Sequence, residues 1–223
     1  MNFIIAPSIL SANFLDVSNE LKKIEKFPNS WVHLDIMDGS FVPVITFGSP
    51  FVKSIRKGSL NIFDVHLMVT APEKQVPFFA DAGANYITFH IESTNNPLDL
   101  IKVIKNLGIK AGLTLKPSTP ISSIEAFLPN VDLVLVMSVE PGASGQKFIE
   151  KALGRVNYIK KLKEKEHFNL LISVDGGINE KNAEEVIKAG ADILVMGSYF
   201  FCNPFKDVEN FIVSLRNKNT PLK

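Results

Sequence analysis

The chain has 223 residues, of which 46% are hydrophobic and 21% are charged, as is typical of a water-soluble globular protein with one sizeable core. Its 24 basic and 23 acidic residues give a formal net charge of +1, which indicates neither nucleic acid nor an anionic membrane as a partner. The single cysteine, Cys202, excludes a disulfide within the chain and favours a reducing, cytoplasmic location.

Short segments rich in Ile, Val, Leu and Phe recur from one end of the chain to the other. The N-terminus lacks the charged segment and long apolar run of a signal peptide, and no apolar stretch approaches the roughly 18 residues of a membrane helix. Near-continuous apolar character is typical of parallel strands that helices cover. We therefore expect eight strands, within residues 3–10, 31–37, 61–69, 86–92, 110–117, 131–139, 170–178 and 192–201.

Segments with a helical period lie between these strands, and several end in a glycine just before the next strand, as a helix C-terminus does. The clearest are 14–27, 72–83, 97–108, 151–166 and 180–190. This alternation, without a linker or low-complexity stretch, predicts a single domain over residues 1–223 with the (β/α)8 TIM-barrel fold. A doubly wound open sheet is the alternative, which the lack of G-x-G-x-x-G after the first strand disfavours.

Four polar residues stand near the carboxyl ends of the expected strands, where TIM barrels carry their chemistry: His33, Asp35, His66 and Asp175. Residues two apart on a strand share a face, so His33 and Asp35 point the same way. The ordinary interpretation of a lone strand histidine is a hydrogen-bonded core residue. Two unpaired carboxylates in the same core favour a cation instead, because burying them costs several kcal/mol or more and Lys116 is the one basic residue expected nearby. Zn, Mn, Fe(II) and Co all accept such mixed nitrogen and oxygen ligands.

Glycine-rich turns follow three successive strands, at 141–145, 175–177 and 197–198. Each alone is compatible with a plain turn, but together they predict a phosphate site, since glycine lets backbone N–H groups approach an anion and TIM barrels commonly hold phosphate after strands seven and eight. A metal, two carboxylates and a phosphate pocket suggest removal of a proton next to a carbonyl on one face and its return on the other. That reaction is an epimerisation.

The motifs APSILSANF, VHLDIMDGSFVP, DVHLMV, VLVMSVEPGASGQKFI, VDGGIN and AGADILVMGS, in this order, resemble the ribulose-phosphate 3-epimerase family over about residues 4–202. The resemblance implies a metal-dependent isomerase of the pentose phosphate pathway, commonly a homo-oligomer. Such an enzyme interconverts D-ribulose 5-phosphate and D-xylulose 5-phosphate through a metal-stabilised enediolate.

By the same resemblance, His33, Asp35, His66 and Asp175 bind one divalent metal ion, and Asp35 and Asp175 are the catalytic acid/base pair. The implied substrate contacts are Ser8, His66, Gly142, Ala143, Ser144, Gly145, Gly176, Gly177, Gly197 and Ser198. Met37, Met68 and Met137 are expected to line the pocket, a role compatible with flexible core filling.

The chain departs from the family pattern N-P-G-F-G-G-Q at residues 140–146, where Glu140 replaces Asn, Ala143 an aromatic and Ser144 a glycine, and it has Val44 where Asn is usual. Because of these changes, the alternative remains that the chain is a 3-epimerase for a hexulose phosphate such as D-allulose 6-phosphate. A lyase or decarboxylase would need a lysine or a different acid set in the pocket. A non-catalytic sugar-phosphate binding barrel is disfavoured by the complete ligand and acid/base set.

Three further polar residues lie near the ends of the fourth and fifth expected strands. His90 and Glu92 have two open interpretations, contacts that support the metal ligands or purely structural roles. Lys116 is either a phosphate contact or a cap on the end of its strand.

Overall fold

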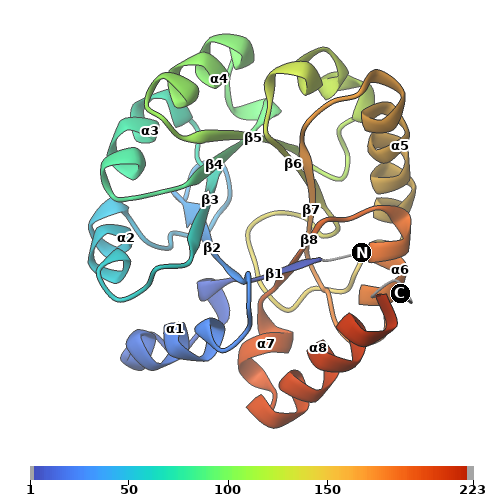
Figure 1. Ribbon diagram of the computed structural model, residues 1–223. Coiled ribbons are helices and arrows are strands. Elements are labelled where there is room, and N and C mark those ends of the chain that lie inside the picture. Colours follow the sequence, from blue (N-terminus) through green and yellow to red (C-terminus); the bar gives the residue numbers. More distant parts are fainter. Residues whose placement is uncertain (1–2, 220–223) are drawn as a thin grey trace.

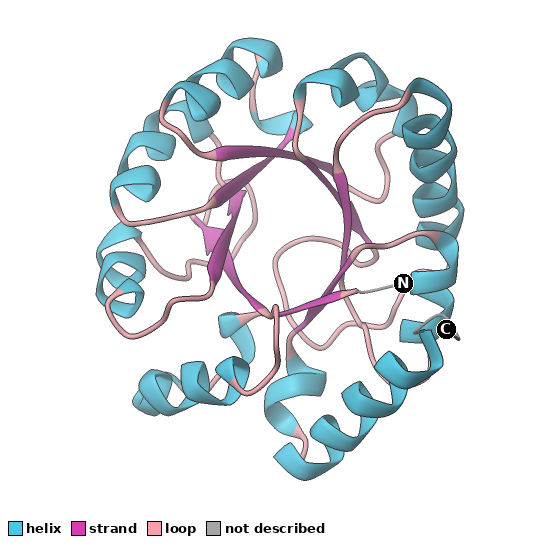
Figure 2. Cartoon of the chain, viewed as in Figure 1, coloured by secondary structure: helices cyan, strands magenta, loops and turns pink. Residues whose placement is uncertain are grey.

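The computed structural model describes residues 3–219, and its strands form a ring that helices surround (Figures 1 and 2). The strands are β1 (Ile4–Pro7), β2 (Trp31–Met37), β3 (Ile62–Met68), β4 (Tyr86–His90), β5 (Lys110–Leu115), β6 (Leu133–Met137), β7 (Leu171–Asp175) and β8 (Ile193–Met196). They pair in parallel in the order β1-β8-β7-β6-β5-β4-β3-β2. A parallel bridge between Ser8 and His33 joins the two ends of this order. The predicted (β/α)8 barrel is confirmed.

Helices cover the outer face of the ring in Figure 1. They are α1 (Val17–Glu25), α2 (Ser49–Arg56), α3 (Pro72–Asp81), α4 (Pro97–Asn106), α5 (Lys151–Glu166), α6 (Ala183–Ala189), α7 (Ser198–Cys202) and α8 (Phe205–Asn219), with 3-10 helices η1 (Ile9–Ser11), η2 (Phe14–Asp16), η3 (Ile91–Ser93) and η4 (Ile121–Asn130). Between β5 and β6 the crossover is η4 alone, where Pro129 disfavours an α conformation at the residue before it. In the described part of the chain, every helix is too short or too polar to cross a lipid bilayer.

The eighth strand is shorter than the apolar run that predicted it. The expected strand 192–201 ends at Met196, and residues 198–201 belong to helix α7, which buries Phe200. Gly197 separates the two elements, with an extended strand before it and helical turns after it. Aromatic residues satisfy a buried strand and a buried helix equally, so apolar character alone did not mark this boundary.

Strand β2 alternates between two environments, as its sequence predicts. Val32, Leu34 and Ile36 belong to the large apolar core between the barrel and its helices. Trp31 belongs to the separate core inside the barrel, where its ring lies 4.6 Å from that of Tyr86. Every residue of β2 is buried. The alternation therefore sends His33, two residues after Trp31, into the barrel interior as well.

Helix α6 ends as its final glycine predicts. Gly190 has φ +121°, and its amide donates to the carbonyl of Ile187. L-residues with a side chain rarely adopt this conformation, so glycine stops the helix and turns the chain into β8. The same crossover geometry, repeated around the ring, brings all eight strand ends to one mouth of the barrel.

Candidate metal centre and active site

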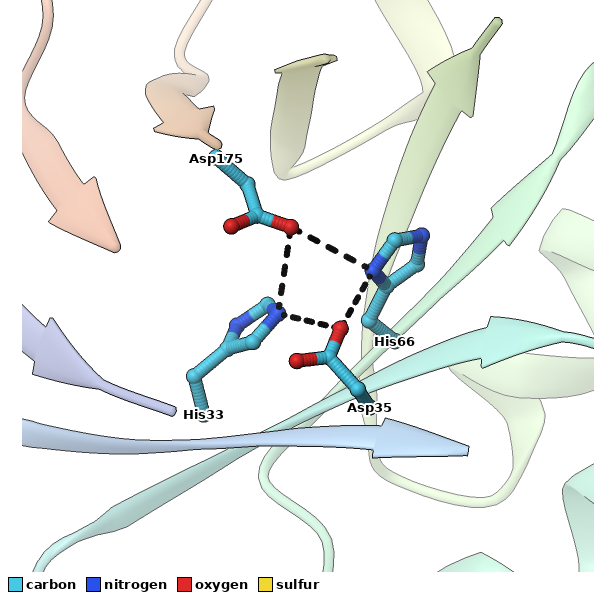
Figure 3. A group of neighbouring side chains, drawn as sticks. All are labelled: His33, Asp35, His66 and Asp175. Carbon is cyan, nitrogen blue, oxygen red and sulfur yellow. Dashed lines mark hydrogen bonds and ion pairs between the residues drawn. The ribbon is translucent and has the colours of Figure 1, made fainter. Parts of the chain in front are cut away.

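Four side chains from three strands meet inside the barrel near its mouth (Figure 3). His33 and Asp35 come from β2, His66 from the neighbouring β3, and Asp175 from the end of β7 across the barrel. The Asp35 Oδ1 atom lies 3.3 Å from His33 Nε2 and 3.1 Å from His66 Nδ1. Asp175 Oδ2 lies 4.0 Å from His33 Nε2 and 3.9 Å from His66 Nδ1. The residues predicted as metal ligands are thus brought together.

Asp64 orients the ring of His33. Its Oδ2 lies 2.8 Å from His33 Nδ1, because the two residues are register partners on β3 and β2 and both point inward. With a proton on Nδ1, His33 presents the lone pair of Nε2 to the cluster, the carboxylate–histidine arrangement common at metal sites. No role for Asp64 follows from the sequence alone. Its spacing from His66 and Met68 indicates an inward side chain, but only the strand register pairs it with His33.

The four ligand atoms fit a divalent cation. One atom from each residue lies within 4.8 Å of the other three. Among the residues the structure describes, His33 Nε2 is a buried nitrogen without a hydrogen-bond partner, and it faces this group. Metal–ligand bonds of about 2.1 Å in tetrahedral geometry separate neighbouring ligand atoms by roughly 3.4 Å, close to the observed spacings. Two imidazoles and two carboxylates are also a donor set that transition metals accept.

The environments of the two aspartates shift their pKa values in opposite directions. Burial would raise the pKa of Asp35, but the His33 and His66 rings outweigh it and hold that pKa well below its usual range. Burial, together with the Asp35 carboxylate, raises the pKa of Asp175 above its usual range. Burial would lower the pKa of His33, yet Asp35 and Asp64 raise it well above its usual value. Two neighbouring carboxyl groups with opposite shifts are the pattern of an acid/base pair.

The two carboxylates also face the cavity at the barrel mouth. The cavity is lined by the expected pocket residues Ser8, Asp35, Met37, Met68, Met137, Gly142, Ala143, Ser144, Gly145, Asp175, Gly176, Gly177, Gly197 and Ser198. His33 and His66 are fully buried and lie beneath this lining. The direct substrate contact expected of His66 therefore stays a prediction.

Ser8 and the methionines shape the wall beside the carboxylates. Ser8 Oγ donates to Asp35 Oδ2 at 2.5 Å, which leaves Asp35 Oδ1 for the histidines. Met37 and Met68 are register partners on β2 and β3, and Met137 pairs with Asp175 across β6 and β7. The polarisable thioethers therefore line the same cavity as the two carboxylates.

The loops after β6, β7 and β8 also line the cavity. Gly177 has φ +64°, and a Cβ there would lie 2.7 Å from the Gln146 carbonyl oxygen and from the Phe148 nitrogen. Only glycine lets these two loops pack this closely. The Gln146 side chain donates to the carbonyls of Glu140 and Ala143 and so ties the altered loop together. Among residues 3–219, no lysine or arginine lines the cavity.

His90, Glu92 and Lys116 lie beside the metal ligands but outside the cavity lining. His90 Nε2 is 2.9 Å from His66 Nε2, and its Nδ1 is 3.4 Å from Glu92 Oε2. The Lys116 amide donates to Glu92, and its ammonium group lies 4.2 Å from the centre of the Phe41 ring. The position of Lys116 therefore supports the structural interpretation over a phosphate contact.

Comparison with known proteins assigns the chain to a family. The model of the ribulose-phosphate 3 epimerase family matches residues 4–201. The ribulose-phosphate 3-epimerases of Treponema pallidum (strain Nichols) and Bacillus subtilis (strain 168) are 42% identical over 207 residues and 45% identical over 195 residues. These matches cover 93% and 87% of this chain and 95% and 90% of the two relatives. The crystal structure of 3-hexulose-6-phosphate synthase from Salmonella typhimurium shares the fold alone, with a TM-score of 0.73, 15% identity and coverage of 99% and 100%. The chain belongs to the ribulose-phosphate 3-epimerase family.

Proposed function

We propose that this protein inverts C3 of a ketose phosphate, converting D-ribulose 5-phosphate to D-xylulose 5-phosphate and back. The observation that carries the proposal is the pair Asp35 and Asp175, which come from opposite sides of the barrel and both line the cavity. Their pKa values are shifted in opposite directions, which suits one group to accept a proton while the other donates one. The names of the relatives support the same reaction.

His33, Asp35, His66 and Asp175 are the residues that would hold a divalent cation, one of Zn, Fe(II), Mn or Co. When bound, such a cation polarises the substrate carbonyl and favours the enediolate formed by proton loss at C3. Asp35 removes the C3 proton of one epimer while Asp175 donates a proton to the opposite face of the planar intermediate, and the two residues exchange these roles for the other epimer. Ser8 holds Asp35 in its orientation through the hydrogen bond to Oδ2. Met37, Met68 and Met137 keep water away from the planar intermediate.

The phosphate is proposed to bind to the backbone of the loops after β6, β7 and β8. Its contacts would be at Gly142, Ala143, Ser144, Gly145, Gly176, Gly177, Gly197 and Ser198. The short helix α7, which begins at Ser198, follows β8 directly, and TIM barrels often bind phosphate at such an element. Backbone amides would supply the donors, since the described lining has no basic side chain.

The test of this function compares two substrates on the purified full-length protein. We expect kcat/KM for D-ribulose 5-phosphate to exceed that for D-allulose 6-phosphate by at least about 10-fold, the smallest effect that one extra group in a fitted pocket usually has. Faster turnover of the hexulose phosphate would instead assign the altered loop at 140–146 to the larger sugar. Carbon–carbon cleavage of either substrate would reject the epimerase, although no lysine among residues 3–219 lines the cavity for such chemistry.

Metal binding should release protons at about pH 7. The raised pKa of His33 favours a second proton on its ring in the metal-free protein, and the ring must lose the proton on Nε2 to bind a cation through that atom. Asp175, whose pKa is also raised, contributes in the same direction. Affinity should therefore fall as the pH is lowered. Titration calorimetry in two buffers of different ionisation enthalpy measures the number of protons, and we expect about one to two. Proton uptake, or affinity independent of pH, would contradict this ligand set.

A further inference from the structure

Buried polar contacts continue from the metal ligand His66 to a second strand end. The Nε2 atoms of His66 and His90 face each other at 2.9 Å, and their ring planes are 25° apart with centroids separated by 5.0 Å. Both rings are fully buried. On its other side, His90 Nδ1 lies 3.4 Å from Glu92 Oε2. No step of the proposed reaction uses His90 or Glu92. His90 Nδ1 is a buried nitrogen without a hydrogen-bond partner among the described residues, and the partly exposed Glu92 carboxylate is its ion-pair neighbour.

The arrangement of nitrogen atoms dictates where the protons lie. Between two imidazole nitrogens at hydrogen-bond distance, one must donate and the other accept. His66 Nδ1 points into the metal cluster, so as a ligand it has a free lone pair and the ring carries its proton on Nε2. His66 Nε2 then donates to His90 Nε2. A neutral His90 that accepts at Nε2 carries its own proton on Nδ1, which is the nitrogen facing Glu92.

Glu92 is itself held firmly by the loop after β5. Its Oε1 accepts from the Lys116 amide at 2.8 Å and from the hydroxyl of Thr119. Arg155 of α5 donates to the backbone carbonyls of Lys116, Pro117 and Thr119 and so fixes the same loop. Burial would raise the pKa of Glu92, but the contacts with His90, Thr119 and Lys116 lower it to about 2. Glu92 is therefore an anchored carboxylate over the whole neutral range.

We propose that Glu92 and His90 are positioning residues that set the tautomer of the metal ligand His66. Glu92 keeps the proton of His90 on Nδ1, His90 accepts the Nε2 proton of His66, and His66 Nδ1 is thereby left free to bind the cation. The opposite tautomer of His90 would donate to His66 Nε2 and drive the proton of His66 onto Nδ1, where it blocks metal binding. The inference rests on the metal dependence proposed above, and it gives His66 the support that Asp64 gives His33.

The first test measures Zn²⁺ affinity of the full-length protein by competition with a chromophoric chelator. Glu92→Gln and His90→Phe should each weaken Zn²⁺ binding about 10- to 100-fold, the usual effect of removing a group that orients a metal ligand. The double variant should bind Zn²⁺ no more weakly than His90→Phe alone, because both residues act through one chain of contacts. His90→Gln should restore part of the affinity, since its amide oxygen can accept from His66 Nε2.

A matched control separates positioning from a loop effect. Thr119→Val removes the hydroxyl that donates to Glu92 but keeps the contact between Glu92 and His90. We expect its Zn²⁺ affinity to stay within about threefold of the wild type, because the carboxylate that faces His90 remains. A loss equal to that of Glu92→Gln would mean that Glu92 merely anchors the loop, and would overturn the proposal. Additive losses in the double variant would overturn it too.

The second test observes the tautomers directly. Long-range ¹H–¹⁵N correlation spectra of the Zn²⁺-loaded protein should show His90 protonated on Nδ1 and His66 on Nε2. His90 protonated on Nε2 would overturn the assignment. A wild-type protein that binds no divalent metal would reject the metal centre and this inference together. Wild-type binding with unchanged affinity in Glu92→Gln and His90→Phe would reject the inference alone.

Discussion

Asp175→Asn should lower kcat for C3 epimerisation by at least about 10³-fold, within the range that general acid–base groups contribute. Asp175 is one of two carboxyl groups at the cavity, and its raised pKa suits it to exchange a proton near neutral pH. Asparagine has nearly the same shape and keeps one oxygen, but it cannot carry a proton between substrate and solvent. The measurement is steady-state epimerisation of D-ribulose 5-phosphate, with thermal unfolding to establish that the fold is retained.

The fate of the C3 hydrogen in D₂O makes this prediction specific to a two-carboxylate reaction. With Asp35 intact, Asp175→Asn should still exchange the C3 hydrogen of one epimer while losing inversion, because each carboxylate serves one face. The matched control is Asp99→Asn, an exposed aspartate of α4 paired with Lys102, which should retain full activity. Near-complete epimerisation by Asp175→Asn, or exchange into both epimers, would contradict the assigned roles.

Much of the site was predictable because the alternation of a strand fixes which way each side chain points. The sequence WVHLDIM sends His33 and Asp35 inward with Trp31, and the structure has them there. Knowing that strand ends share one mouth of a barrel then brings Asp175 close to them. The resemblance to the family added the expected role of each residue, and the family itself is established by the match over residues 4–201.

Contacts that depend on the stagger of neighbouring strands were not predictable. Asp64 lies opposite His33 only in the observed register of β2 and β3, and a shift of one residue would turn its side chain to the outer face. The link from His66 to Glu92 likewise passes through His90 on β4. No local sequence pattern specifies the register of β4 relative to β3. Sequence patterns thus specify faces and ends of strands, whereas the hydrogen bonds that orient the proposed metal ligands follow from tertiary register.

Removing the metal with a chelator should abolish turnover and lower the thermal stability of the protein. Without a cation, the Asp35 carboxylate repels that of Asp175 and so raises its pKa, and His33 Nε2 is among the buried polar atoms of the described residues without a hydrogen-bond partner. A cation that binds only the folded state stabilises it by about 2.7 kcal/mol at a hundredfold excess over Kd. For a chain of this size that corresponds to a Tm shift of roughly 5–11 °C.

The readdition of single ions then identifies the cofactor, since Zn, Fe(II), Mn and Co share this ligand preference and differ in the activity that each restores. His66→Asn is the informative companion, because it removes one ligand while Asp35 and Asp175 remain to exchange protons. Its Tm should respond to added metal much less than that of the wild type, and its activity should stay low. Turnover that survives exhaustive chelation, with no bound metal by elemental analysis, would contradict a metal-dependent reaction. Without a cation, the two carboxylates and His33, whose pKa is raised, would have to stabilise the enediolate. That arrangement is unfavourable, because no lysine or arginine among the described residues lines the cavity.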